Sequence, residues 1–123
     1  MKRVLDVGQC VPDHGSIRRL VEGRFGAQVS QADDLTGALA KLRQTPFDLV
    51  LVNRKLDLDY SDGLEIIKQM KADPDLAAIP VMLVSNYADA QAEAVAIGAT
   101  LGFGKAAIGN PQTDDLLRPF LAE

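Results

Sequence analysis

Residues 48–53 read Asp-Leu-Val-Leu-Val-Asn, a run of four apolar residues between two polar ends. Neighbouring residues of a strand point to opposite faces of the sheet, so a strand with this run presents apolar side chains to both faces. Strands of this kind lie at the centre of parallel sheets, where helices cover both faces. The stretch therefore predicts an α/β fold with a buried parallel sheet.

On both sides of this stretch, apolar runs of strand length alternate with amphipathic segments of helix length. Four more strands are expected, over residues 4–8, 27–32, 81–85 and 101–104. The expected helices begin near Asp13 or Ser16, near Asp33 or Asp34, at Gly63, at Ala88 and at Pro111. Pro119 is expected to kink or end the last helix, because proline lacks an amide donor. These elements predict a three-layer, doubly wound sheet in a single domain over residues 1–123.

The composition fits one folded domain and argues against several classes of function. The chain has 123 residues, 47% hydrophobic and 24% charged, a size and balance typical of soluble globular domains. Its net charge of −4, scattered basic residues and lack of tryptophan argue against nucleic-acid binding. One cysteine and one histidine provide neither a disulfide framework nor a zinc site. No apolar run approaches the roughly 20 residues that span a membrane, so we expect a soluble, cytoplasmic protein.

Four stretches give a more specific indication through their order and spacing. They are residues 47–52 (Phe-Asp-Leu-Val-Leu-Val), 62–67 (Asp-Gly-Leu-Glu-Ile-Ile), 78–85 (Ala-Ile-Pro-Val-Met-Leu-Val-Ser), and Gly98-Ala99 followed by Lys105. Together they resemble the receiver domains of two-component response regulators, the CheY-like group, over essentially the whole chain. The resemblance implies a five-stranded parallel sheet of order 2-1-3-4-5, in a phosphorelay signalling domain that is not an enzyme.

Receiver domains hold Mg²⁺ with an acidic pair after the first strand and accept a phosphoryl group on an aspartate that ends the third strand. In this chain the acidic pair falls on Gly8 and Gln9, and the acceptor position falls on Asn53. Ser85 and Lys105 match the family's hydroxyl and lysine positions. A neutral amide is not a nucleophile for phosphoryl transfer, and Mg²⁺ usually binds through one or two carboxylates. We therefore expect a degenerate receiver, or pseudo-receiver, with no phosphorylation and no bound metal or other cofactor.

The family also carries an aromatic switch residue on the fifth strand. Its position is best matched by Gly102, which leaves Phe103 on the opposite face of the strand. Because Gly102 has no ring to rotate, we expect one dominant conformation around Ser85 and Gly102.

The resemblance leaves Lys105 facing a pocket that has lost three negative charges, and a partly buried ammonium needs a partner. The candidate carboxylates are Asp6, Asp13, Asp57 and Asp59. We expect Asp6 first, and Asp57 or Asp59 second. Asp6 lies in a strand that is buried on both faces, so it either reaches Lys105 or has a raised pKa. His14, near a helix start, is expected to be solvated.

The loop over residues 54–61 alternates Leu56, Leu58 and Tyr60 with polar residues. Loops at the carboxyl ends of strands often carry binding specificity. The three side chains either form an apolar stripe for a partner or fold down onto the domain.

Three functions remain open. The leading one is an interaction module that contacts a protein partner, such as a histidine kinase or an output domain, as a monomer or weak homodimer. The second is a phosphorylatable receiver with Asp57 or Asp59 as a displaced acceptor, although neither residue ends a strand. The third is a small flavodoxin-like ligand-binding protein, although residues 8–12 form no glycine-rich phosphate loop.

Overall fold

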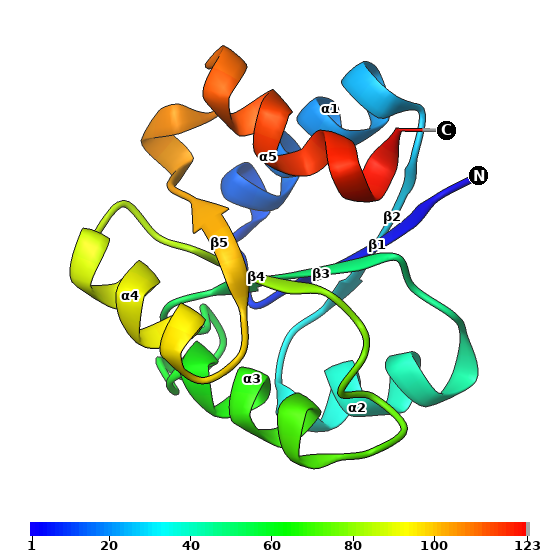
Figure 1. Ribbon diagram of the computed structural model, residues 1–123, viewed down its shortest axis with the longest axis vertical. Helices are drawn as coiled ribbons and strands as arrows, with labels where there is room; N and C mark the ends of the chain where they lie inside the picture. The colour runs from blue at the N-terminus through cyan, green and yellow to red at the C-terminus, as the bar shows by residue number, and fades with distance from the viewer. Residues whose placement is uncertain (123) are drawn as a thin grey trace.

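The computed structural model describes residues 1–122 and contains one five-stranded, all-parallel sheet (Figure 1). Its strands are β1 (Arg3–Val7), β2 (Gln28–Ala32), β3 (Leu49–Asn53), β4 (Val81–Val84) and β5 (Thr100–Phe103). They lie in the order β2-β1-β3-β4-β5. The α/β class, the three layers and the strand order expected from the sequence are therefore confirmed.

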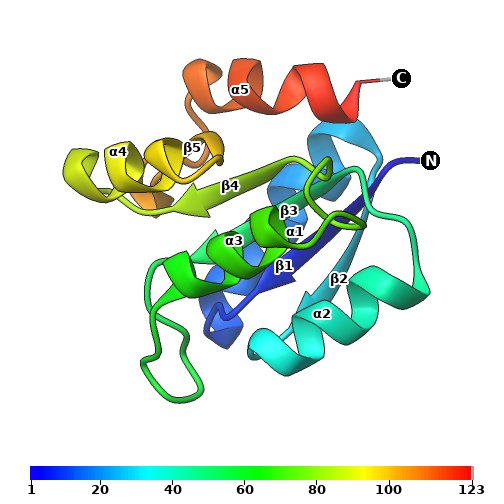
Figure 2. The same cartoon turned by 60° about the horizontal axis from the view of Figure 1, so that its bottom comes forward.

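Five α-helices cover the two faces of the sheet (Figures 1 and 2). They are α1 (Val11–Phe25), α2 (Leu35–Gln44), α3 (Gly63–Ala72), α4 (Ala88–Ala96) and α5 (Pro111–Leu121), with a short 3₁₀ helix, η1 (Lys105–Ala107), after β5. Helices α1 and α5 pack on one face, and α2, α3 and α4 pack on the other. Within residues 1–122, no helix has the length and apolar character that crossing a membrane requires.

Strand β3 joins the two hydrophobic cores on either side of the sheet. Its residues Leu49–Val52 are all fully buried. Leu49 and Leu51 pack among side chains of α1 and α5, whereas Val50 and Val52 pack among side chains of α2, α3 and α4. The apolar run from which the fold was predicted thus serves both layers.

Two helix ends differ from the sequence-based expectation. Helix α1 is capped by Cys10 and begins at Val11, earlier than a cap at Asp13 or Ser16 predicts. Pro12 fits this first turn because amides there have no partner within the helix. Helix α5 continues through Pro119 to Leu121, so Pro119 does not end it. Only its final turn lies beyond the proline, and Leu121 is fully buried, which offsets the lost hydrogen bond.

Candidate functional site

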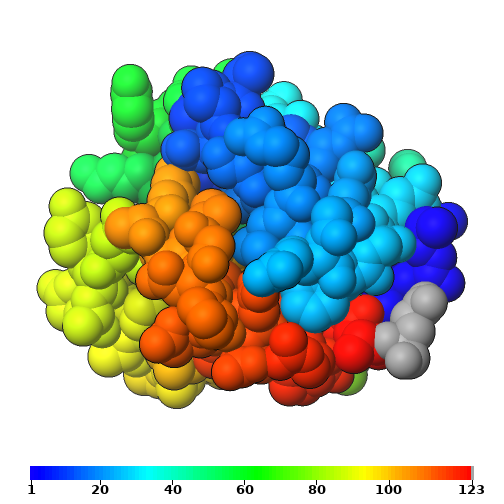
Figure 3. Space-filling view, turned by 90° about the horizontal axis from the view of Figure 1, so that it is seen from above, coloured from blue at the N-terminus to red at the C-terminus, as the bar shows by residue number. Residues whose placement is uncertain are grey.

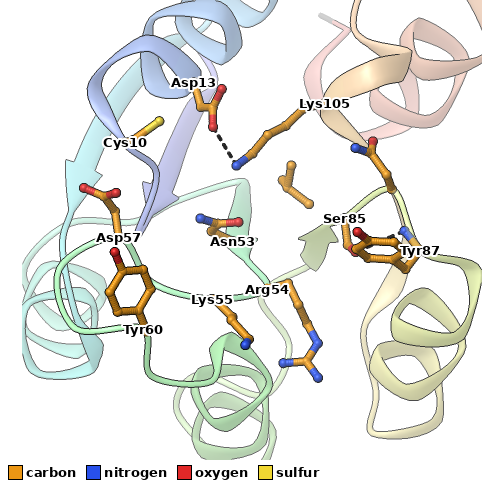
Figure 4. A pocket seen from close by; sticks show the side chains of 12 residues that line it. Cys10, Asp13, Asn53, Arg54, Lys55, Asp57, Tyr60, Ser85, Tyr87 and Lys105 are labelled. Carbon is orange, nitrogen blue, oxygen red and sulfur yellow. Dashed lines mark hydrogen bonds and ion pairs between the residues drawn. The ribbon is translucent and has the colours of Figure 1, made fainter.

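A cleft of about 400 Å³ lies at the carboxyl ends of β3 and β4, between the start of α1, the loop after β3 and the start of α4 (Figure 4). Asn53, Ser85 and Lys105, three of the residues expected in the pocket, line it together. Gly8 and Gln9 are not among the lining residues. Sequence reasoning missed Tyr87, which follows β4 and faces Tyr60 across the cleft.

Asn53 and the loop after β3 are both tied to the backbone of Gly8. The Asn53 side-chain amide donates to the Gly8 carbonyl at 3.1 Å, and the Asp57 backbone amide donates to the same carbonyl at 2.9 Å. Gly8 has a φ of 79°, in the left-handed region that favours glycine. A Cβ atom at this position would lie 2.3 Å from the Leu56 Cδ2 atom. A side chain at position 8 therefore requires Leu56 to move.

Lys105 pairs with Asp13 at the rim of the cleft, at 2.7 Å from Nζ to Oδ2 (Figure 4). The sequence-based prediction of Asp6 as the first choice of partner for Lys105, with Asp57 or Asp59 second, is therefore wrong. Asp13 is the remaining carboxylate of the four candidates. The reason is the early start of α1, which puts Asp13 in its first turn, at the edge of the cleft. The Lys105 ammonium holds the pKa of Asp13 below its usual range. The two side chains are 30% and 34% exposed, so solvent weakens their attraction.

Asp6 instead belongs to a buried polar cluster beneath α1, formed by Asp6, Gln9 and His14 and called here the β1 cluster. The His14 Nδ1 and Asp6 Oδ2 atoms lie 2.6 Å apart, and Asp6 is fully buried. Burial raises the pKa of Asp6 to about 6, although the contact with His14 lowers it. His14 is therefore mostly buried and paired, contrary to the expectation that it is solvated.

Gln9 is the third member of the β1 cluster, and its side chain is not hydrogen-bonded to any of residues 1–122. Its side chain is 3% exposed, and within residues 1–122 neither its amide nitrogen nor its carbonyl oxygen has a hydrogen-bond partner. The second carboxylate oxygen of Asp6 also has none there. Gln9 still lies near enough to Asp6 to favour its charged form, an effect smaller than that of burial. The β1 cluster is thus buried but incompletely paired.

The loop after β3 is a closed hairpin that projects from the body of the domain, as the green segment in Figures 2 and 3 shows. An antiparallel bridge between Lys55 and Asp62 closes it. Leu56 is buried, whereas Leu58 and Tyr60 are exposed, so the predicted stripe is divided between the core and the surface. Asp59 accepts a hydrogen bond from the Ser61 amide at 3.0 Å within the loop itself.

The end of β4 forms the other side of the cleft, and β5 lies next to β4. The Ser85 hydroxyl accepts from the Tyr87 amide at 3.2 Å. Gly102 is buried, and a Cβ atom there would lie 2.2 Å from the Leu83 carbonyl oxygen. Phe103 points the other way, into the core beneath α1 and α5. The switch position of the family thus has no room for a side chain.

Comparison with known proteins assigns this domain to a family. The model of the response regulator receiver domain matches residues 10–105, which is more than half of the chain. The chain belongs to this family. Receiver domains are modules of two-component signalling that contact other signalling proteins, such as kinases or output domains. Membership favours the signalling function over a flavodoxin-like ligand-binding protein.

Solved receiver domains have the same fold. The signal receiver domain of a DNA-binding response regulator (merR) from Colwellia psychrerythraea superposes with a TM-score of 0.81 at 21% identity, covering 97% of both chains. The chemotaxis protein CheY4 of Vibrio cholerae gives 0.78 at 22% identity, covering 98% of this chain and 99% of its own. These identities establish the receiver fold and no shared partner.

The chain is also similar in sequence to a longer protein, the gliding motility regulatory protein of Myxococcus xanthus. The two are 29% identical over an alignment of 103 residues, and the match covers 73% of this chain. The match covers 13% of that protein's length. The receiver domain described here therefore corresponds to a small part of that relative.

Proposed function

We propose that this receiver domain is a protein-interaction module that works without phosphorylation. The observation that carries the proposal is Asn53 at the end of β3, with its amide bonded to the Gly8 carbonyl inside the cleft. Where the family presents a carboxylate to an incoming phosphoryl group, this chain presents a neutral amide that is already engaged. An amide supplies no anionic oxygen to attack phosphorus.

We extend the proposal to Mg²⁺, because the groups at the family's metal position do not fit this ion. Mg²⁺ prefers carboxylate and other hard oxygen ligands in octahedral geometry. Gly8 has no side chain, and Gln9 and Asn53 are amides. Two neighbouring acidic groups are committed elsewhere, since Asp6 contacts His14 and Asp13 contacts Lys105. Asp57 also lines the cleft, but it is a single carboxylate on the loop after β3.

The edge of the cleft is the surface that we propose for a partner protein. Tyr60 and Tyr87 are 77% and 70% exposed on opposite sides of the cleft, and Leu58 is exposed on the same hairpin as Tyr60. Tyrosine is enriched at protein interfaces because it combines a large apolar surface with a hydrogen-bonding group. A histidine kinase or an output domain is the class of partner that the family favours.

One observation favours a second candidate, a receiver with a displaced acceptor. Asp57 lines the cleft together with Ser85 and Lys105, so a carboxylate does reach the site. It lies on the exposed hairpin and not at a strand end, so it is poorly held for attack in line with a donor phosphate. Asp59 is not among the residues that line the cleft.

Intact mass spectrometry after incubation with acetyl phosphate and Mg²⁺ tests these proposals. We expect no gain of a phosphoryl group in the wild-type domain, while a phosphorylatable receiver domain gains one under the same conditions. A gain that disappears in Asp57→Asn would support the second candidate and reject the first. A gain that persists in Asp57→Asn would contradict the first proposal and the assignment of Asp57 as the acceptor, and would leave Asp59 as the displaced acceptor to be tested.

A further inference from the structure

The register between strands β4 and β5 shifts by one residue between Met82 and Val84. Met82 pairs with Thr100 and Val84 pairs with Phe103, so one residue of β4 faces two residues of β5 between these pairs. An extra residue of this kind is a β-bulge, and it disrupts the backbone hydrogen bonds around it. Leu83 and Gly102 lie in this interval, and both are buried. Their backbone groups therefore need other partners.

A single side chain from α4 supplies those partners. The Gln91 Nε2 atom donates to the Leu83 carbonyl at 2.9 Å and to the Ser85 carbonyl at 3.1 Å, and its Oε1 atom accepts from the Gly102 amide at 3.0 Å. The Gln91 side chain enters from a helix of mostly small residues and is only 8% exposed. Its carboxamide takes the place of a peptide group between the two strands. Gln91 with Leu83, Ser85 and Gly102 is called here the amide lock.

The absence of a side chain at Gly102 is part of the same arrangement. A Cβ atom would come within 2.2 Å of the Leu83 carbonyl oxygen, which is also the oxygen that Gln91 binds. A larger residue would push β5 away from β4 and separate the Gly102 amide from Gln91. The glycine and the glutamine therefore depend on each other.

We propose that the amide lock holds α4, β4 and β5 in one arrangement, so that the surface formed by α4 and β5 does not change with the state of the cleft. To move α4 away from the strands, three buried backbone groups must lose their side-chain partner together. Ser85 lies in both the lock and the cleft, so its position is fixed as well. This inference goes beyond the proposed function, because it holds whether or not the cleft accepts a phosphoryl group.

Amide hydrogen exchange and relaxation-dispersion NMR on the whole domain test the proposal. In the wild type we expect the Gly102 amide to exchange as slowly as the amides of β3, and no millisecond exchange at residues 83–85 and 100–103. In Gln91→Ala we expect Gly102 to exchange at least roughly tenfold faster relative to β3, with new millisecond exchange at the same residues. Gln91→Leu, which keeps most of the volume and removes the hydrogen bonds, should behave in the same way.

Gln69→Ala is the matched control, because Gln69 is an exposed helical glutamine whose amide donates to the exposed Glu65 side chain, at 3.2 Å. It should leave the exchange of Gly102 unchanged. Millisecond exchange at residues 83–85 and 100–103 of the wild type would overturn the proposal, even if neither Gln91 variant folds. Unchanged protection of Gly102 in a folded Gln91 variant would overturn it as well.

Discussion

The side chains of two buried glutamines, Gln91 on the α4–β5 side of the domain and Gln9 on the β1 side, differ in how fully they are hydrogen-bonded. Gln91 uses both ends of its amide to join two strands and a helix, whereas Gln9 is at least as buried and has no hydrogen-bond partner within residues 1–122. The two side chains are thus about equally buried, but among residues 1–122 the Gln91 amide has hydrogen-bond partners and the Gln9 amide has none. A buried amide strengthens a structure only when its partners are present, and otherwise it carries the cost of losing water. The difference predicts a rigid α4–β5 side and a more tolerant β1 side.

The largest effect is expected from enlarging Gly102. Gly102→Ala places a methyl group against the Leu83 carbonyl oxygen, a backbone atom that cannot turn aside. We expect the free energy of unfolding to fall by about 3 kcal/mol or more, from overpacking together with loss of the amide lock. Urea unfolding followed by circular dichroism measures this change. Gly23→Ala is the control, because nothing lies within 4 Å of a Cβ atom there and the helix should gain slightly. Equal stabilities of Gly102→Ala and the wild type would mean that the α4–β5 side is no more rigid than the β1 side.

The same substitution at the two glutamines tests the comparison directly. Gln91→Leu leaves the Leu83 carbonyl and the Gly102 amide without their partner, so we expect a loss of about 2 kcal/mol. Gln9→Leu removes an amide that has no hydrogen-bond partner among residues 1–122 and replaces it with an apolar group of similar size. We expect its effect to stay within about 1 kcal/mol of the wild type, with stabilisation as the favoured sign. A Gln9 variant as unstable as the Gln91 variant would mean that Gln9 is paired in solution.

The β1 cluster should also make stability depend on pH. Because burial raises the pKa of Asp6 from 3.8 to about 6, the folded domain binds this proton more tightly than the unfolded chain. The cost of the buried charge is present above about pH 6 and is relieved as the pH falls toward about 4. Relative to Asp6→Asn, the wild type should therefore gain about 1–2 kcal/mol between about pH 7 and about pH 4.

Urea unfolding of both proteins across this pH range measures the gain. His14→Gln should move the window to higher pH, because contact with His14 lowers the pKa of Asp6. A wild-type stability that stays constant or falls relative to that of Asp6→Asn on acidification would contradict this account.

The smallest effect is expected at the rim of the cleft. Lys105 and Asp13 are each about one-third exposed, so water can solvate either group when its partner is removed. Lys105→Met and Asp13→Asn should each change the free energy of unfolding by less than about 1 kcal/mol. Thermal unfolding of the two variants and of the double variant gives the coupling between them. A coupling free energy well above about 1 kcal/mol would show that this pair is held as firmly as the α4–β5 side.

The sequence supported the prediction of the fold because the deciding signals are local. The apolar run at residues 48–53 is long enough to exclude an exposed strand, and the segments around it alternate without interruption. The position of Gly102 on β5 was also predictable, since strand periodicity assigns faces. The partner of Lys105 was not, because it depends on where α1 begins, and the helix begins at Val11, before the expected cap at Asp13 or Ser16.

Gln91 was not identified from the sequence for a different reason. A glutamine in an alanine-rich helix has the same local signal whether it faces solvent or a neighbouring strand. Its role depends on a one-residue bulge in β5, which is set by packing between distant segments. Ala90 and Ala94, which mark the buried face of α4, were the only nearby signal, and small residues mark a face weakly.

The carbonyl of Gly8, which binds both Asn53 and the hairpin, affects how this sequence can change. An aspartate at position 53 would replace the amide donor with an oxygen that repels this carbonyl, and a side chain at position 8 would collide with Leu56. A carboxylate at position 8 or at position 53 therefore disturbs the loop before a second carboxylate is there to share a cation. Restoring carboxylates at positions 8 and 53 would therefore require the loop over residues 54–62 to be rebuilt at the same time.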